Sequence, residues 1–247
     1  MAGEADHGLP AKVNSVLTEF VDSTKNAFAR DLRSIVLYGS GAEGKLRPTS
    51  DVNVIVVLTQ FDESKAKQLR EPLRLAEAAI QLRAMFLLES EVQPASQAFA
   101  VKFADVQRRH RVLYGDDLFA ALSVSREDSI FRLKQTLLNL ILRLRESYIA
   151  RGLREEQLAA TIADAAGPLR SCAATLLELE GVASESARHA LERISSSLPG
   201  AEKRADELNL ISEARERQAL SPGVAGPTLF HLIELARLMW ARAAALK

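Results

Sequence analysis

Apolar residues recur along the first half of the chain in two patterns, one typical of helices and one typical of buried strands. From Pro10 to about residue 30 they return every three or four positions, which predicts an amphipathic helix. Two continuous runs of Val, Ile and Leu follow over about 34–38 and 52–58, as expected for strands buried on both faces. Helical spacing returns over about 64–84, and weaker runs at 85–92 and 99–106 predict two more short strands.

After about residue 122 the strand patterns disappear and helical spacing continues to the end of the chain. Ser125 opens a long amphipathic run, and further helices are predicted over about 155–180, 184–197, 201–219 and 227–246, separated by glycine-containing breaks. Together these patterns predict an α+β fold. A mixed β-sheet with helices would occupy residues 1–121, and an all-α antiparallel helical bundle would occupy residues 122–247.

Charge and composition restrict the compartment and the partners. The 32 basic and 32 acidic residues cancel, which argues against nucleic acid as a partner because no overall positive field would attract it. Cys172 is the only cysteine, so no disulfide can form within the chain. Since we find neither a signal peptide nor an apolar run of about 18 residues, we expect a cytoplasmic protein without a membrane partner.

One polar motif stands between the two strongest strand patterns. Gly39-Ser40 follows the first strand, and Asp51-Val52-Asn53 begins the second after ten intervening residues. Small residues in the Gly39–Gly41 turn would let phosphates approach backbone N–H groups and the Ser40 hydroxyl. Side chains two positions apart on a strand point to the same face, so Asp51 and Asn53 could share a metal. Oxygen ligands of this kind suit Mg²⁺.

The combined motif resembles the signature of the DNA polymerase β-like nucleotidyltransferase superfamily, which is Gly-Ser, a spacer and Asp-x-Asp. The stretches 36–44 and 50–56 are similar to small bacterial members, the aminoglycoside nucleotidyltransferases and the minimal nucleotidyltransferase antitoxins. Residues 109–115 resemble the end of such domains, and the aminoglycoside enzymes also continue into a helical bundle. The resemblance implies a nucleoside triphosphate substrate, expected to be ATP, with Mg²⁺ as cofactor. Lys45 and Arg47 occupy a loop where such proteins often carry basic residues, compatible with phosphate binding.

The chain departs from the family pattern at its acidic positions. Asn53 replaces the second acid, so it can offer a carbonyl oxygen to a metal but no charge. A third acid is expected from a later strand, where Glu89, Glu91 and Asp105 are the candidates, and we take Asp105 as the third metal ligand. Lys102, predicted on the same strand as Asp105, would oppose a metal.

Two functions remain open. The first is metal-dependent transfer of a nucleoside monophosphate to a hydroxyl of a small molecule or protein, weakened by Asn53, with Asp51 and Asn53 as catalytic residues. The alternative is a catalytically degenerate protein of the same fold that binds a nucleotide or a protein partner. A fused toxin is disfavoured because His189 and His231 lack the upstream arginine of an Arg-x(4–6)-His element. The amphipathic C-terminal helix leaves a homodimer open.

Overall fold

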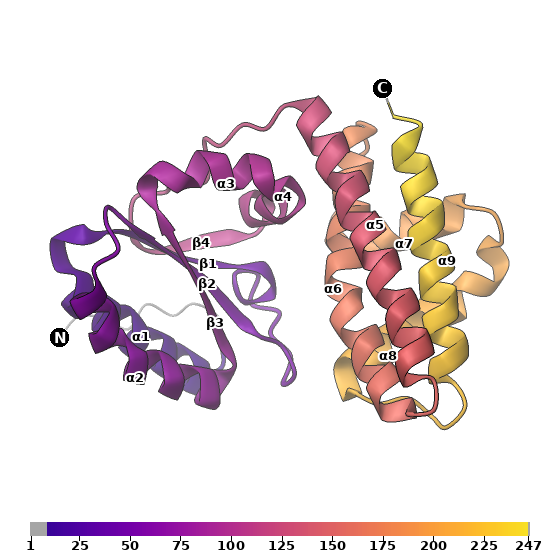
Figure 1. Cartoon of the computed structure of the whole chain (residues 1–247), viewed down its shortest axis with the longest axis horizontal. Helices are drawn as coiled ribbons and strands as arrows, with labels where there is room; N and C mark the ends of the chain where they lie inside the picture. The colour runs from indigo at the N-terminus through magenta and orange to yellow at the C-terminus, as the bar shows by residue number, and fades with distance from the viewer. Residues whose placement is uncertain (1–8, 247) are drawn as a thin grey trace. The chain divides into compact units, whose positions relative to one another are not determined.

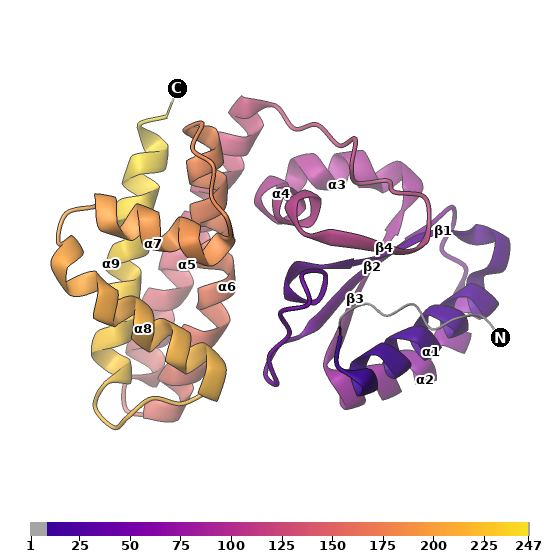
Figure 2. The same cartoon turned by 180° about the vertical axis from the view of Figure 1, so that it is seen from behind.

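The chain forms two compact units of different architecture (Figures 1 and 2). The computed structural model describes residues 9–246, apart from the side chains of 201–203. The first unit contains the described residues up to Ser96 together with Phe103–Ser123. The second contains Gln97–Lys102 and the described residues from Val124 onward. The predicted α+β class is confirmed, with a mixed sheet early in the chain and helices alone after it.

The first unit is built on a sheet whose order in the described residues is β3-β2-β1-β4. Its strands are β1 (Leu32–Tyr38), β2 (Val52–Leu58), β3 (Leu82–Leu88) and β4 (His110–Gly115). β1 is antiparallel to both β2 and β4, whereas β2 and β3 are parallel. Parallel neighbours need a crossover connection, which α2 (Glu63–Ile80) provides.

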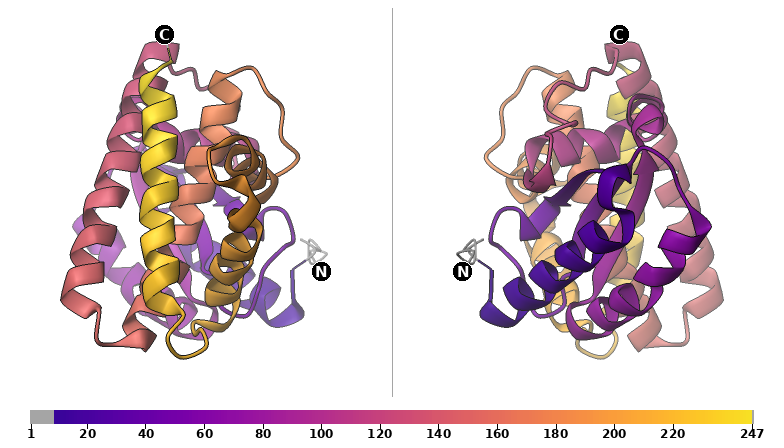
Figure 3. Two further views of the ribbon diagram at one scale, coloured as in Figure 1. Left: turned by 90° about the vertical axis from the view of Figure 1, so that its right-hand side faces the viewer. Right: turned by 90° about the vertical axis from the view of Figure 1, so that its left-hand side faces the viewer.

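Helices cover both faces of this sheet, which explains the continuous apolar runs of its central strands. α1 (Ala11–Phe28) and α2 pack on one face, where Phe20 and Phe28 join Leu37 and Val56 in one core. On the other face lie α3 (Val92–Ala98) and α4 (Ala100–Arg108), where Phe103 packs with Ile55 and Val57. Figure 3 (right) shows α1 and α2 lying side by side on their face.

The structure corrects one predicted strand and the end of one predicted helix. The strand predicted over 99–106 is wrong, because this segment lies almost entirely in α4 and the fourth strand is β4. Ala100, Phe103 and Val106 are buried at intervals of three, which is a helical period that a short window does not distinguish from a strand. The helix predicted over 64–84 ends at Ile80, since Gln81 adopts a left-handed conformation with φ 53° and β3 begins at Leu82.

The second unit is entirely helical, as predicted. Its helices are α5 (Arg126–Arg151), α6 (Glu155–Leu179), α7 (Ala187–Ser197), α8 (Ala201–Arg217) and α9 (Ala225–Ala244). α6 is central and contacts the other four, and it continues through Pro168 (Figure 3, left). Cys172 and Leu169 are fully buried in it. In the described part of the chain, no helix combines the length and the apolar character needed to cross a bilayer.

A buried carboxylate joins the turn before β1, the loop after β2 and helix α2 in the first unit. Asp31 is 5% exposed and accepts hydrogen bonds from Gln60 Nε2 at 3.0 Å and from Lys65 Nζ. These hydrogen bonds, with Gln60 first, lower the pKa of Asp31. A carboxyl with a lowered folded-state pKa stabilises the fold above its unfolded pKa, and that contribution is lost as the pH falls through the folded value.

We therefore expect Asp31→Asn to lower the urea midpoint of unfolding at pH 7, and we expect the difference from wild type to shrink below about pH 4. Circular dichroism at pH 7 and pH 3 measures it. The matched control is Asp22→Asn, because Asp22 is an exposed acid whose partner is Lys25 at 2.9 Å. Equal midpoint shifts for both variants at pH 7 would contradict the role of Asp31.

Candidate nucleotide-binding site

A compact glycine turn closes the end of β1. Gly39–Gly41 form a single 3₁₀ turn in which Gly39 has φ +75°, a conformation that favours glycine. Gly39 N–H donates to the Arg109 carbonyl at 2.8 Å, which ties the turn to the start of β4. A Cβ on Gly41 would lie 3.2 Å from Leu37 Cδ1, so the turn packs closely on its own strand. The Gly-Ser motif thus forms the small-residue turn that the sequence predicted.

The loop after this turn carries the predicted basic residues. Lys45 N–H donates to the Ser40 carbonyl at 2.9 Å, which fixes the loop beside the turn. The Lys45 side chain is 68% exposed and its Nζ lies 3.7 Å from Glu43 Oε1. Arg47 is anchored through its backbone N–H, which donates to Ser50 Oγ at 3.3 Å. Lys45 and Arg47 therefore bring two cationic side chains to the loop that leaves the turn.

One row of residues crosses every strand of the described sheet at this same end. Arg83 on β3 is the register partner of Asn53 on β2, and Asn53 is the partner of Tyr38 on β1. Tyr38 is in turn the partner of His110 on β4. Because direct partners on neighbouring strands point to the same face, these four side chains share the face that α3 and α4 cover.

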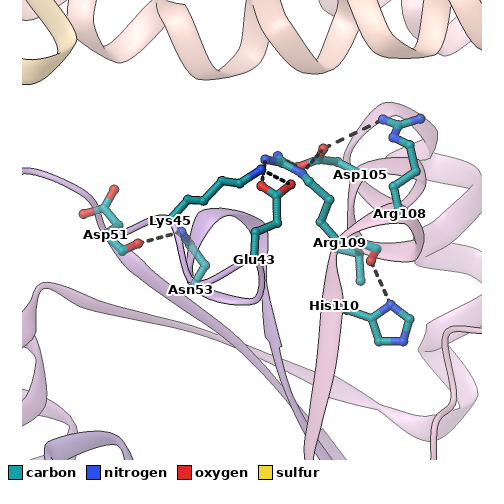
Figure 4. Close-up of polar contacts among 9 residues, drawn as sticks. Glu43, Lys45, Asp51, Asn53, Asp105, Arg108, Arg109 and His110 are labelled. Carbon is teal, nitrogen blue, oxygen red and sulfur yellow. Dashed lines mark hydrogen bonds and ion pairs between the residues drawn. The ribbon is translucent and has the colours of Figure 1, made fainter. Parts of the chain in front are cut away.

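Asp51 lies directly before β2, next to this row. Its side chain is 50% exposed, and Oδ1 lies 3.7 Å from Arg83 Nε. Arg83 also forms an ion pair with Glu77 of α2. The Asn53 side-chain amide donates to the Asp51 backbone carbonyl at 3.3 Å, as Figure 4 shows. The two motif residues thus lie together, with a guanidinium as the charged neighbour of the carboxylate.

Asp105, the predicted third ligand, lies on α4 and is held by arginines. Arg109 Nε donates to Asp105 Oδ1 at 3.0 Å, and Arg108 Nη2 lies 3.8 Å from the same oxygen. Arg109 also donates to Glu43 Oε2 at 3.1 Å. In Figure 4, Glu43 and the side chain of Lys45 lie between Asp105 and Asp51. The structure therefore does not bring Asp105 to the Asp51–Asn53 pair.

The other two candidate acids lie at the far end of the sheet. β3 runs parallel to β2 with Leu82 beside Val52 and Leu88 beside Leu58. Glu89 and Glu91 follow Leu88, so about 20 Å of strand separates them from the Asp51 end. Glu89 forms an ion pair with Arg33 at 3.2 Å, and Glu91 accepts from the Leu88 N–H at 2.9 Å. Lys102, like Asp105, lies on α4 rather than on a strand.

The phenol of Tyr38 is a proton donor in this row. Burial is the main cause that raises its pKa to about 12, and the negative charges of Asp105 and Asp51 add to the shift. The phenol is therefore protonated at neutral pH and can donate a hydrogen bond to an anion. Neither Tyr38 nor Arg83 was assigned a role from the sequence motif. Arg83 could be found from its place as the second residue of β3, because β3 is parallel to β2 and pairs Arg83 with Asn53.

These donors do not fit a magnesium ion. Within residues 9–246 no three His, Cys, Asp or Glu side chains form a group that could hold a metal. Asp51 offers one carboxylate, Asn53 turns its amide nitrogen toward backbone, and the Arg83 guanidinium lies within 3.7 Å of the carboxylate. A second cation placed beside that guanidinium would be repelled by it.

Comparison with known proteins identifies the fold. No family model and no curated protein matches the chain. The crystal structure of spectinomycin adenyltransferase AAD(9) from Enterococcus faecialis, with ATP and spectinomycin, is similar at a TM-score of 0.64 and 12% identity, over 90% of this chain and 98% of that one. A toxin-antitoxin structure with AMP-PNP matches at a TM-score of only 0.28 and 16% identity, over 54% of this chain and 95% of that one. The chain therefore shares the fold of the spectinomycin adenyltransferase along 90% of its length.

Proposed function

We propose that the first unit binds the phosphates of a nucleoside triphosphate without a metal ion and does not transfer the nucleotide. The protein would then act as a nucleotide-binding module of nucleotidyltransferase fold. One observation carries this proposal: Arg83 is in register with Asn53 and lies 3.7 Å from Asp51, where a metal-dependent enzyme needs negative charge.

The groups around the Gly39–Gly41 turn suit an anion. Lys45 and Arg47 follow the turn, Arg83 stands at the edge of the row, and Tyr38 supplies a hydroxyl donor. Guanidinium and ammonium groups make strong charge-assisted hydrogen bonds with phosphate oxygens. The solved structure of similar fold contains ATP, which supports ATP as the nucleotide for this chain.

We expect no nucleotidyl transfer because the site lacks the negative charges that would hold a metal ion. A metal ion stabilises charge that develops on the transferred phosphoryl group and on the leaving pyrophosphate. For comparison, removing a single hydrogen-bond donor that stabilises transition-state charge costs an enzyme about 10²–10³-fold in rate. Here the second acid is Asn53, and Asp105 is bound by Arg109. We therefore expect nucleotidyl transfer to be absent or far below that of an enzyme with a complete acidic set.

The second candidate function is nucleotidyl transfer itself. Asp51 stands at the expected position with a half-exposed carboxylate, and the similar solved structure is an adenyltransferase. Under this alternative, Asp51 and Asn53 would hold Mg²⁺, and a nucleoside monophosphate would pass to a hydroxyl of a small molecule or protein. The alternative requires Arg83 to move away from Asp51 when the metal enters.

Calorimetric titration of the full chain with ATP separates these candidates. We expect binding in EDTA that is as tight as, or tighter than, binding in excess Mg²⁺, because Arg83 and Lys45 would compete with the metal for the phosphates. Binding that occurs only with Mg²⁺ would favour the transferase. No binding in either buffer would contradict nucleotide binding altogether.

A further inference from the structure

A pocket of about 340 Å³ lies beside helix α2 in the first unit. Six of the eight residues that line it are apolar, and the other two are Glu63 and Arg70. The apolar ones are Phe28, Phe61, Ala66, Leu69, Leu73 and Phe86. Small-molecule sites have volumes of roughly 300–1,000 Å³ and combine an apolar lining with a few polar groups. We call this cavity the α2 pocket, and its size and lining are those of a ligand site.

Three phenylalanines form one end of the α2 pocket. The ring centroid of Phe61 lies 6.5 Å from that of Phe28 and 6.3 Å from that of Phe86. Phe28 and Leu69 are at most 3% exposed and form the floor, whereas Phe61 is 59% exposed. Aromatic rings attract one another in offset or edge-to-face arrangements at such distances. A flat aromatic body therefore suits this end, where it would cover the exposed Phe61 ring.

The two charged residues of the α2 pocket differ in their partners. Glu63 forms an ion pair with Lys67 at 2.7 Å, so its charge is balanced. Arg70, in contrast, forms no hydrogen bond and no ion pair within residues 9–246. A guanidinium binds a carboxylate through two parallel hydrogen bonds, which makes Arg70 a ready partner for a ligand that carries this group.

The charges along α2 also set the direction of a bound carboxylate. Asp62 caps the helix and Glu63 begins it, so two acids stand next to Phe61 at the aromatic end. Arg70 comes seven residues after Glu63, which is about 10 Å along the helix axis. A carboxylate is repelled at the acidic end and attracted at Arg70.

We propose that the α2 pocket binds a small aromatic carboxylate, with its ring among the phenylalanines and its carboxylate at Arg70. This site is distinct from the nucleotide site. Phe86 follows Arg83 by three positions on β3, so the two side chains point to opposite faces of the sheet. The proposal therefore does not rest on nucleotide binding.

Two probes that differ only in charge test the α2 pocket on the full chain. Naphthylacetate carries an aromatic body and a carboxylate, and naphthylacetamide replaces the carboxylate by a neutral amide. We expect ligand-observed NMR titrations to show roughly three- to tenfold tighter binding of naphthylacetate, a modest factor because Arg70 is exposed and solvent screens its charge. Arg70→Gln should remove this preference and leave the binding of naphthylacetamide unchanged. The matched control is Arg74→Gln, which lies one turn further along α2 and outside the pocket lining, and it should keep the preference.

A second variant tests the position of the site. In Ala66→Trp the new indole would fill the α2 pocket, so the binding of both probes should fall by more than about tenfold. Ala78→Trp is its control, because Ala78 is an exposed alanine of α2 outside the lining, and it should bind both probes as wild type does. Circular dichroism checks that each variant retains the helical content of wild type.

Three results with these proteins would overturn the proposal. They are equal binding of the two probes by wild type, binding of neither probe, and unchanged binding by a folded Ala66→Trp protein. Displacement of naphthylacetate by ATP would overturn it as well, because the probe would then occupy the nucleotide site.

Discussion

Replacing Arg83 with Glu is expected to lower the affinity for metal-free ATP by roughly 10–100-fold. A hydrogen bond to a charged group contributes about 1.5–3 kcal/mol, and each 1.4 kcal/mol corresponds to a factor of about ten in affinity. Arg83 stands beside Asp51 and in register with Asn53, so its removal leaves the carboxylate facing the phosphates. Calorimetry in EDTA measures the loss.

The double variant Arg83→Glu with Asn53→Asp extends this prediction. It places carboxylates at positions 83 and 53 next to Asp51, on neighbouring strands in register. Three carboxylates at one edge of a sheet are the kind of oxygen donors that Mg²⁺ prefers. We therefore expect ATP binding by the double variant to require Mg²⁺, whereas binding by wild type does not.

The control for both variants is Arg74→Glu on α2, an exposed arginine whose partner is Glu71 at 2.6 Å. It reverses the same charge on the helix that precedes β3 and should leave ATP affinity within about twofold of wild type. If Arg83→Glu binds metal-free ATP as tightly as Arg74→Glu does, Arg83 has no role in phosphate binding.

The sequence predicted the central strands and most helices because their signals are local and strong. β2 matches its predicted span, since Val54 to Leu58 are fully buried and no helical reading fits a run of that length. The strand prediction for 99–106 failed because its signal is weak. Its apolar residues form no long continuous run, and Ala100, Phe103 and Val106 are buried at intervals of three, a period that a window of eight residues does not distinguish from a weak strand.

The site could be predicted only as far as residues close in sequence define it. Gly39–Gly41 and Asp51 with Asn53 follow from two neighbouring strands. Arg83 enters through the parallel register of β2 and β3, which depends on how far α2 extends before β3 begins. A helix predicted to residue 84 covered that position, so the strand pattern from 85 onward did not mark Arg83 as a neighbour of Asn53.

The largest loss of stability is expected at Gly115, where β4 ends against β1. A Cβ at this position would lie 1.9 Å from the Arg33 carbonyl oxygen, and Gly115 has φ +76°. Left-handed strain costs a non-glycine residue about 1–2 kcal/mol, and overpacking costs a further 1–3 kcal/mol. We expect Gly115→Ala to lower the free energy of unfolding by about 2–5 kcal/mol, measured by urea denaturation at pH 7.

Two other glycines separate the clash from the strain. Gly39 has nearly the same φ, +75°, but a Cβ there would meet nothing within 4 Å, so Gly39→Ala should cost only the strain of about 1–2 kcal/mol. Gly167 lies inside α6 with open space around it, and Gly167→Ala should stabilise by about 0.5–1 kcal/mol. If Gly115→Ala lowers the free energy of unfolding no more than Gly39→Ala does, then Gly115 does not pack against the Arg33 carbonyl as described.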